Sequence, residues 1–226
     1  LSTRPERLGK SAAGLYGDVM EEIDEGIGAL VAMLEKSGRL DNTLIIITSD
    51  NGPWYLGNAG MQRGRKGNTF EGGMRVPFIA HWPAAIPEGQ QSAAMAMGID
   101  LVPTLLEILK LPPPNDRVLD GKSLLVQLQS GAASAHDYLH YYDGETLFAV
   151  RDQRFKYRGP AGVFYGTDQM PIAGAVPQKE WLFDLEKDPG ESYDVSARYP
   201  EKLIELRTEF ERTRAEMASN KRGWID

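Results

Sequence analysis

Residues 43–52, TLIIITSDNG, decide the fold of the first part of the chain. The apolar run 44–47 ends at Thr48 and Ser49, and Asp50, Asn51 and Gly52 follow. A short apolar run that ends in a turn signal is typical of a strand buried in a parallel sheet. Ligands of open α/β sheets bind just beyond the carboxyl ends of strands, so we expect Asp50 and Asn51 to lie in a binding site.

The strand is followed by a glycine-rich stretch, residues 52–73, and a loop of this length inside a compact domain is usually functional. Three basic residues lie in it: Arg63, Arg65 and Lys66. The oxygens of Asp50 and Asn51 are hard donors that suit Ca²⁺ or Mg²⁺. A cation beside a basic loop suits an oxyanion, such as a sulfate or phosphate ester. Spacing alone also fits an Asx turn that closes a strand and an ordinary solvated lysine.

The composition bounds the class of protein. Of the 226 residues, 42% are hydrophobic and 25% charged, which is ordinary for a globular chain. The net charge of −7 argues against broad nucleic-acid binding, because phosphate backbones need a basic surface. No apolar run approaches the roughly 18 residues of a membrane span. The absence of cysteine excludes internal disulfides and thiolate metal sites and leaves the compartment undecided.

Hydrophobic periodicity predicts alternating helices and strands before residue 132. Apolar residues at three- and four-residue steps predict an amphipathic helix over 14–37. The other elements expected here are strand 43–49, a second buried strand 76–82, a helix from Asp100 to about Lys110 with Asp100 as its cap, and a short helix 123–129 that ends at Gly131.

After Gly131 the pattern changes to short strands. We expect strands at 138–142, 148–150, 154–158 and 181–185, an irregular excursion over 159–179, and a last helix that starts near Pro200. The fold class predicted is therefore α/β, with a sheet and flanking helices over 1–132. A small antiparallel sheet with one covering helix follows over 133–226.

Several segments, in this order, resemble a known family. They are 43–52, GRKGNTFEGGMRVP at 64–77, DLVPTLL at 100–106, LDG at 119–121, LFDL at 182–185 and DPGE at 188–191. Together they resemble the C-terminal half of an arylsulfatase-type sulfatase, and they cover most of the chain. The resemblance implies part of an alkaline-phosphatase-like sheet. It also implies a metal-dependent sulfuric ester hydrolase.

The resemblance implies roles for particular residues. Asp50 and Asn51 would complete a divalent site, usually Ca²⁺ and otherwise Mg²⁺, whose other carboxylates lie upstream. Lys66 would be the catalytic lysine that contacts the sulfate, and Trp54 is a weaker candidate for substrate binding. We expect four residues to shape the loop, namely Thr69, Glu71, Gly72 and Gly73.

One departure from the family is informative. These enzymes use a formylglycine made from Cys or Ser in a C/S-x-P-S/A-R motif, and this chain contains no such motif. Because the chain begins at Leu1, we interpret it as a fragment that is inactive alone, with the nucleophile and the N-terminal half of the enzyme as its missing partner. The substrate implied is a sulfate ester of a small molecule or sugar. The compartment implied is periplasmic, secreted or lysosomal.

Two other functions stay open. A phosphonate or phosphate ester hydrolase of the same superfamily shares the Asp50 and Asn51 ligands, and a non-catalytic fragment could bind a sulfated ligand. The upstream sequence would separate these alternatives, since each predicts a different nucleophile or none.

The remaining polar residues are expected to have minor roles. We expect Arg75 to pair with a carboxylate inside the fold, and His81 to be a core residue or to support the residues of the site from behind. His136 and His140 are too isolated to form a metal pair, and Tyr165 with Gly166 could border the substrate leaving group.

Overall fold

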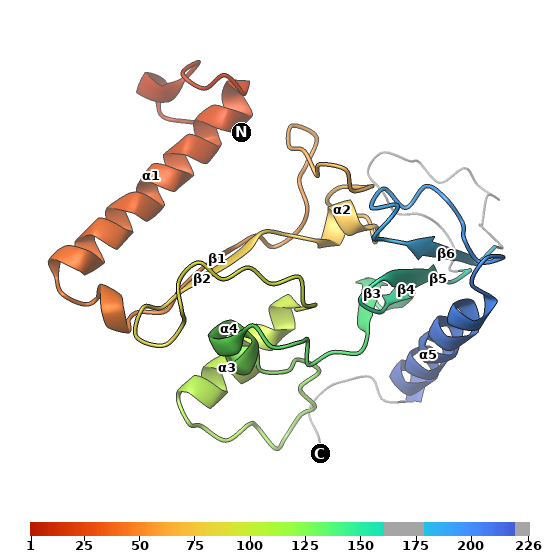
Figure 1. The fold of residues 1–226 in the computed structure, drawn as a ribbon. Coiled ribbons are helices and arrows are strands. Elements are labelled where there is room, and N and C mark those ends of the chain that lie inside the picture. Colours follow the sequence, from red (N-terminus) through yellow and green to blue (C-terminus); the bar gives the residue numbers. More distant parts are fainter. Residues whose placement is uncertain (161–178, 220–226) are drawn as a thin grey trace.

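The computed structural model describes residues 1–160 and 179–219. Figure 1 shows helix α1 projecting from the body of the molecule, followed by a two-stranded ribbon that leads to α3 and α4. The second sheet, which has four strands and is covered by α5, lies at the opposite end (Figure 1). The prediction of helices and a first sheet followed by an antiparallel sheet with one helix is confirmed.

Helix α1 spans Gly14–Lys36, as the periodicity predicted. The N-terminal segment, with the 3-10 turn η1 (Pro5–Arg7), folds back on its first turns. The buried carboxylate of Asp18 accepts hydrogen bonds from the main-chain amides of residues 9–11 at 2.7–2.9 Å. Large apolar side chains of α1 remain exposed, namely Met20, Ile23, Leu30 and Met33. The apolar face of this helix is therefore not covered by the described parts of the chain.

The first sheet is a ribbon of two antiparallel strands. After the short turn η2 (Leu40–Asn42), β1 (Ile45–Thr48) pairs with β2 (Phe78–His81), with Ile45 opposite His81. The prediction that strand 43–49 is parallel and buried is wrong for this pairing. The connection from β1 turns back through a loop instead of crossing over, and such a connection gives antiparallel neighbours. No further described strand covers the ribbon, so β1 is half-buried and most of β2 is exposed.

Three α-helices lie between β1 and the second sheet. A single turn, α2 (Glu71–Met74), precedes β2, and α3 (Leu101–Ile108) comes after the 3-10 turn η3 (Gly98–Asp100). Helix α4 (Leu125–Ser130) ends at Gly131, whose φ of 67° is left-handed, as expected for a C-terminal glycine.

Asp100 precedes α3, but its side chain does not cap that helix. The buried carboxylate accepts hydrogen bonds from the amides of Met97 at 2.7 Å and Lys122 at 2.8 Å, and it lies 2.8 Å from Nε2 of His136. The capping prediction was wrong in this respect, because a carboxylate buried among three partners is better satisfied there than at the helix end.

The second sheet has the order β3-β4-β5-β6 and is antiparallel throughout. Its strands are β3 (Leu139–Asp143), β4 (Thr146–Arg151), β5 (Phe155–Arg158) and β6 (Trp181–Asp184). Helix α5 (Pro200–Ser219) packs Leu206 and Phe210 on one face of the sheet. The core formed there also contains Leu147, Val150, Phe155, Tyr157 and Leu182.

Among the described helices, none combines the length and the apolarity needed to cross a membrane. Tyr165 and Gly166, which were expected to border the leaving group, lie outside the described residues.

Candidate functional site

The carboxyl end of β1 carries Asp50 and Asn51 in a tight turn. Asp50 is exposed and Asn51 is half-buried. The Ser49 hydroxyl donates a 3.0 Å hydrogen bond to the carbonyl oxygen of Asn51, and Nδ2 of Asn51 donates one of 2.9 Å to the carbonyl oxygen of Gly52. The turn is therefore fixed by its own polar groups, and it leaves the Asp50 carboxylate at the surface.

The glycine-rich loop returns to this turn through main-chain hydrogen bonds. The amide of Lys66 donates to the carbonyl oxygen of Pro53 at 2.9 Å, and the amide of Gly52 donates to that of Gly73 at 2.8 Å. Pro53 is three residues beyond Asp50, a Cα distance of at most about 11 Å along a trans chain. The structure therefore brings Lys66 to the turn that holds Asp50 and Asn51.

Close backbone contact explains the glycines at this place. A Cβ atom added to Gly52 would lie closer than 3.0 Å to the carbonyl oxygen of Gly72. One added to Gly73 would lie equally close to the carbonyl oxygens of Arg65 and Asn68. Gly72 and Gly73 belong to α2 and not to the loop itself, and they let the loop pack directly on the first turn of that helix.

The donors on the turn fit a hard divalent cation. The nearest described polar contact of the Asp50 carboxylate is the Ser49 hydroxyl at 3.5 Å, and no described residue donates to Oδ1 of Asn51. Both oxygens are thus available to an ion. Within residues 1–160 and 179–219 no group of three or more His, Cys, Asp or Glu side chains could hold a metal. Among the described residues, Asp50 and Asn51 are therefore two candidate oxygen donors, fewer than a divalent cation needs.

The three basic residues of the loop differ in their surroundings. The Arg63 guanidinium lies 4.2 Å from the centre of the Phe70 ring and donates to the carbonyl oxygen of Glu191 at 3.1 Å. The Arg65 guanidinium lies 4.6 Å from the centre of the Tyr55 ring. Lys66 is exposed, and its ammonium forms no ion pair with another described residue. Lys66 is consequently the basic side chain of this loop best placed to meet an anion.

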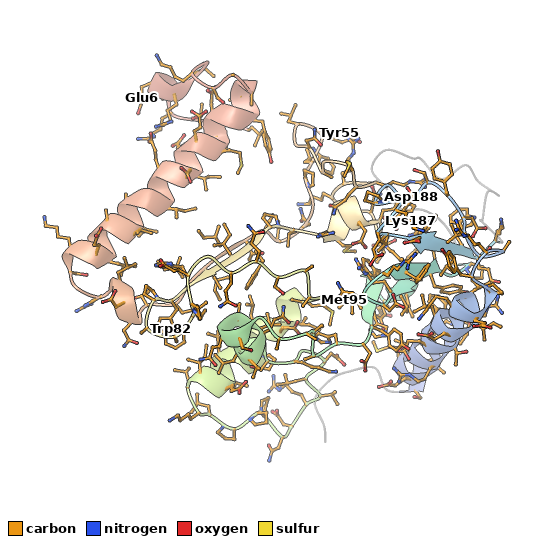
Figure 2. All side chains as sticks on the ribbon, in the orientation of Figure 1. Glu6, Tyr55, Trp82, Met95, Lys187 and Asp188 are labelled. Atoms are coloured by element: carbon orange, nitrogen blue, oxygen red, sulfur yellow. The ribbon has the colours of Figure 1, made fainter. Side chains whose placement is uncertain are left out.

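The aromatic residues after the turn lie at the surface. Trp54 is 48% exposed and meets Tyr55 edge to face, with ring centres 4.8 Å apart. Figure 2 shows Tyr55 towards the outer end of the loop between β1 and α2. The position of Trp54 is compatible with contact to a bound ligand as well as with packing inside the loop.

Two minor predictions are wrong. Arg75 directly follows α2, is exposed and forms no ion pair with the described residues. His81 is exposed on β2, because no described element covers that strand. His140, in contrast, lies 2.9 Å from a carboxylate oxygen of Glu209 on α5, and His136 contacts Asp100, so these two histidines do not meet.

Glu71 is buried in a cluster of charged groups that the sequence did not predict. Tyr141 Oη donates to Oε1 of Glu71 at 2.6 Å, and Nη1 of Arg151 donates to its Oε2 at 2.7 Å. Nζ of Lys156 lies 3.1 Å from Oε1 of Glu71 and 2.9 Å from Oε1 of Glu191. The turn and loop are thereby joined to strands β3, β4 and β5.

The electrostatics of this cluster keep Glu71 ionised. Burial acts to raise the pKa of the Glu71 carboxyl, but the positive charges of Lys156 and Arg151 outweigh it and leave that pKa below its usual value. For Glu191 the cost of burial dominates, and its pKa is raised. The same burial, with Glu71 beside it, raises the pKa of the Tyr141 hydroxyl well above its usual value.

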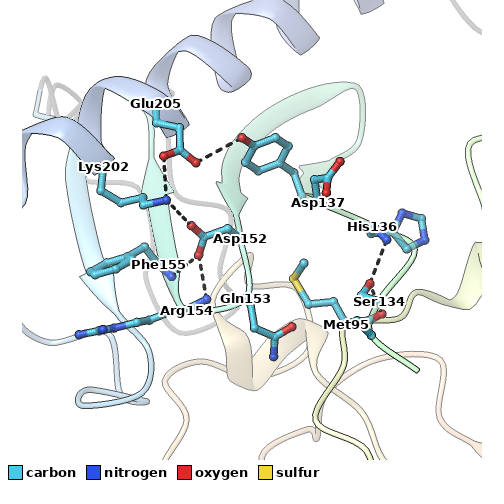
Figure 3. Close-up of a pocket in the computed structure, with 12 residues that line it drawn as sticks. Met95, Ser134, His136, Asp137, Asp152, Gln153, Arg154, Phe155, Lys202 and Glu205 are labelled. Atoms are coloured by element: carbon cyan, nitrogen blue, oxygen red, sulfur yellow. Dashed lines mark hydrogen bonds and ion pairs between the residues drawn. The ribbon is translucent and has the colours of Figure 1, made fainter. Parts of the chain in front are cut away.

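An open cavity of about 630 Å³ lies elsewhere, between the second sheet and the segment that precedes it. Figure 3 shows Lys202 and Glu205 of α5 on one side of it and Met95, Ser134 and His136 on the other. Nζ of Lys202 lies 3.0 Å from Asp152 and 2.7 Å from Glu205. No residue of the turn or the loop lines this cavity. Of its other charged groups, Arg154 pairs with Asp184 and His136 contacts Asp100, both outside the lining.

Two family models match the chain. The model described as Sulfatase matches residues 3–111, and that described as N-sulphoglucosamine sulphohydrolase, C-terminal, matches residues 65–216.

Individual relatives agree with these matches. The chain is 38% identical over 220 residues to the steryl-sulfatase of Rattus norvegicus, covering 85% of this chain and 38% of that protein. It is 41% identical over 210 residues to the N-acetylgalactosamine-6-sulfatase of the same organism, covering 83% of this chain and 40% of that protein. The chain thus spans about two fifths of the length of these curated relatives.

Solved structures give the same result for the fold. The PsFucS1 sulfatase from Pseudoalteromonas sp. aligns with a TM-score of 0.82 at 28% identity, covering 97% of this chain and 47% of that one. The phosphonate monoester hydrolase of Agrobacterium radiobacter aligns with a TM-score of 0.57 at 28% identity, covering 87% of this chain and 41% of that one.

Proposed function

Because this chain belongs to the sulfatase family, we propose that the protein of which it is a part hydrolyses sulfate esters with the help of a divalent metal ion. The observation that carries the proposal is the hydrogen bond from the Lys66 amide to the Pro53 carbonyl oxygen, which holds a basic residue beside Asp50 and Asn51. A cation site next to an exposed ammonium matches the charge of a sulfate ester.

Asp50 and Asn51 are proposed as two ligands of the metal, which is Ca²⁺ or, alternatively, Mg²⁺. Their exposed and half-buried positions and their available oxygens support this role. When bound, such an ion draws negative charge from the oxygens of the sulfuryl group. The carboxylate of Asp50 supplies the negative charge of the pair, and the amide oxygen of Asn51 adds a neutral donor.

Lys66 is proposed to contact the sulfate directly. Its ammonium would offset the charge of the non-bridging oxygens and favour departure of the leaving oxygen. Trp54 is proposed to border the bound ester with its exposed ring. Three residues, Thr69, Gly72 and Gly73, are proposed to fix the loop, since Thr69 is buried and both glycines lie in close backbone contacts.

The remaining parts of the active site are proposed to come from a segment upstream of this chain. That segment would supply the formylglycine nucleophile and the other metal ligands, since the chain has neither cysteine nor a serine in the required motif. It would also cover the ribbon and α1, whose exposed apolar residues include Ile23, Leu30, Phe78 and Ile79. The part of this chain that it joins is proposed to be residues 1–132, with 133–226 as a separate subdomain.

The proposed substrate is a sulfate ester of a sugar. The relative at 41% identity is an N-acetylgalactosamine-6-sulfatase, and another aligned structure, at 30% identity and a TM-score of 0.67, is described in complex with its substrate D-glucosamine-2-N,6-O-disulfate. The likeness to a phosphonate monoester hydrolase supports phosphonate ester hydrolysis as the second candidate.

The experiment compares hydrolysis by the complete protein of three esters: a sugar 6-sulfate, an aryl sulfate and an aryl phosphonate monoester. We expect the sugar sulfate to be preferred, the activity to be lost with chelator, and Ca²⁺ or Mg²⁺ to restore it. Lys66→Ala should lower kcat/KM by about 100-fold or more. Lys36→Ala, at the exposed end of α1, is the matched control and should have no effect. Preference for the phosphonate would establish the second candidate, and no hydrolysis of any ester would refute both.

A further inference from the structure

The loop that carries Lys66 lies over buried charges that the proposed chemistry does not use. Lys156 on β5 and Glu191 in the segment after β6 are completely buried, and Glu71 is 3% exposed. Lys156 is the described residue whose ammonium touches both carboxylates, at 3.1 Å from Glu71 and 2.9 Å from Glu191. Removing charges from water is costly. Oε1 of Glu191 is buried and accepts no hydrogen bond from a described residue, so the nearby Lys156 charge compensates it.

The cluster holds the main chain of the loop as well as its side chains. Nζ of Lys156 donates a 2.9 Å hydrogen bond to the carbonyl oxygen of Thr69. Oε2 of Glu191 accepts a 2.6 Å hydrogen bond from the amide of Glu71. The main-chain carbonyl oxygen of Glu191 accepts a 3.1 Å hydrogen bond from the Arg63 guanidinium. The side chains of Lys156 and Glu191 therefore bind the main chain at the end of the stretch 63–71, and the main chain of Glu191 binds the Arg63 side chain at its start. Lys66 lies between these contacts.

The backbone of Glu191 supports the same conclusion. Its φ of 48° is left-handed, a region that a residue with a side chain rarely adopts. Such a conformation persists where surrounding contacts determine it, and it occurs preferentially at functional sites. Here the carboxylate and the carbonyl oxygen of Glu191 both face the loop. Figure 1 shows the segment after β6 running beside α2.

We propose that Lys156 is a positioning residue for Lys66: by bridging Glu71 and Glu191, it fixes the loop 63–71 in the conformation that presents the Lys66 ammonium beside Asp50 and Asn51. The proposal rests on the proposed function as far as it concerns sulfate, but the control of loop conformation stands independently of it. The antiparallel sheet thereby contributes to the position of Lys66 through its contacts with Thr69 and Glu71.

The experiment uses the complete protein with Lys156→Met, which removes the ammonium and keeps most of the side-chain volume. A second variant, Lys156→Met with Glu191→Gln, removes both charges and so avoids an unpaired buried carboxylate if the first fails to fold. Lys202→Met is the matched control, because Lys202 also bridges two carboxylates but touches no residue of the loop.

The first measurement is hydrogen exchange followed by mass spectrometry, which needs no substrate. We expect peptides covering 63–73 to exchange about tenfold faster in both Lys156 variants, with α5 and β4 unchanged. Lys202→Met should leave the loop at the wild-type rate. Unchanged exchange in the loop, or an equal increase throughout the sheet, would overturn the proposal whether or not the protein hydrolyses sulfate.

The second measurement is a double-mutant cycle on kcat/KM with the sugar sulfate. If Lys156 acts through Lys66, the double Lys156 and Glu191 variant should lower kcat/KM in wild-type background but hardly at all once Lys66→Ala is present. If Lys156 only stabilised the fold, the double Lys156 and Glu191 variant would lower kcat/KM by the same factor in both backgrounds. That result would refute the positioning role.

Discussion

The amide of Gly52 donates a 2.8 Å hydrogen bond to the carbonyl oxygen of Gly73, which joins the turn after β1 to the first turn of α2. The hydrogen bond from the Lys66 amide to the Pro53 carbonyl oxygen joins the same turn to the middle of the loop. Two main-chain hydrogen bonds therefore hold the long loop against this turn. The position of Lys66 relative to Asp50 thus depends on two main-chain contacts, and Gly52 and Gly73, which form one of them, have no room for a Cβ atom.

The first prediction concerns Gly73→Ala. The added methyl group would lie closer than 3.0 Å to the carbonyl oxygens of Arg65 and Asn68, which belong to the backbone and cannot rotate away. We expect a loss of about 1–3 kcal/mol in the free energy of unfolding, although alanine is the better helix former. Urea denaturation followed by circular dichroism measures it.

Gly26→Ala in α1 is the matched control. Nothing lies within 4 Å of a Cβ atom at Gly26, and the residue is in the middle of a helix. The same substitution should therefore stabilise the protein there, by about 0.5–1 kcal/mol. Destabilisation of similar size at both positions would show that close packing is not the reason for Gly73.

Local patterns predicted much of this fold. The four strands of the second sheet and the helix after Pro200 are marked by apolar runs and turn residues within a few positions of them, and the structure confirms them. The prediction of a parallel strand at β1 was wrong, since β1 pairs antiparallel with β2. An apolar run such as 44–47 occurs in both parallel and antiparallel sheets, so it does not indicate the direction of pairing.

The polar contacts could not be predicted in the same way. Glu71 was assigned a structural role in the loop, but its partners Tyr141, Arg151 and Lys156 are more than 60 residues away and no periodicity joins them. Asp100 likewise has a signature typical of a cap, while its contact with His136 depends on how two loops meet. Asp50 and Asn51 were predicted as site residues because they follow the end of a strand, and Lys66 was predicted from the family resemblance. Their roles stay predictions.

The second prediction is a dependence of stability on pH through Glu209. Hydrogen bonds from Arg212 and His140 lower the pKa of this carboxyl from 4.5 to about 2. Because the folded pKa lies below the ordinary value, the stabilisation is complete above pH 4.5 and is lost as the pH falls towards 2. The melting temperature of Glu209→Gln should be below that of wild type at pH 6, and the difference should disappear near pH 2.

Glu211→Gln is the control for this measurement. The pair of Glu211 with Arg214 is exposed on α5, and such surface pairs contribute little. We expect no difference from wild type at either pH. A Glu209→Gln difference that stays constant between pH 6 and pH 2 would contradict the assignment to ionisation.

The third prediction is that the 226-residue chain alone does not hydrolyse sulfate esters. It contains neither cysteine nor a serine followed two residues later by proline, so the residue from which formylglycine is made is lacking. The chain should be assayed with an aryl sulfate and Ca²⁺ against its own Lys66→Ala variant. Turnover by the wild-type chain well above that of the variant would contradict the prediction.

The fourth prediction is weak metal binding by the same chain. Ca²⁺ takes about six to eight oxygen ligands, and Asp50 with Asn51 supplies only part of such a set. Calorimetric titration with Ca²⁺ should show no tight site. A micromolar site that is lost in Asp50→Ala would reveal ligands in this chain other than those identified. Lys66→Ala is the control, since removing an ammonium should not weaken binding of a cation.

The last prediction concerns the ribbon of β1 and β2. A two-stranded ribbon is marginally stable by itself, and here Phe78 and Ile79 are 40% and 55% exposed. Strand β5 is central in the second sheet, and all of its residues are buried. In the chain alone, the amides of β1 should exchange with solvent about tenfold faster than those of β5.

Comparing hydrogen exchange of the 226-residue chain with that of the complete protein tests whether the upstream segment covers the ribbon. If that segment covers the ribbon, exchange in β1 should become slower in the complete protein, while exchange in β5 stays the same. The substitution Ile79→Ser should reduce this protection, because it removes part of the apolar surface that the segment would bury. Equal exchange rates in β1 and β5 of a monomeric 226-residue chain would mean that the ribbon is stable without a covering segment, and the proposed docking surface would be wrong.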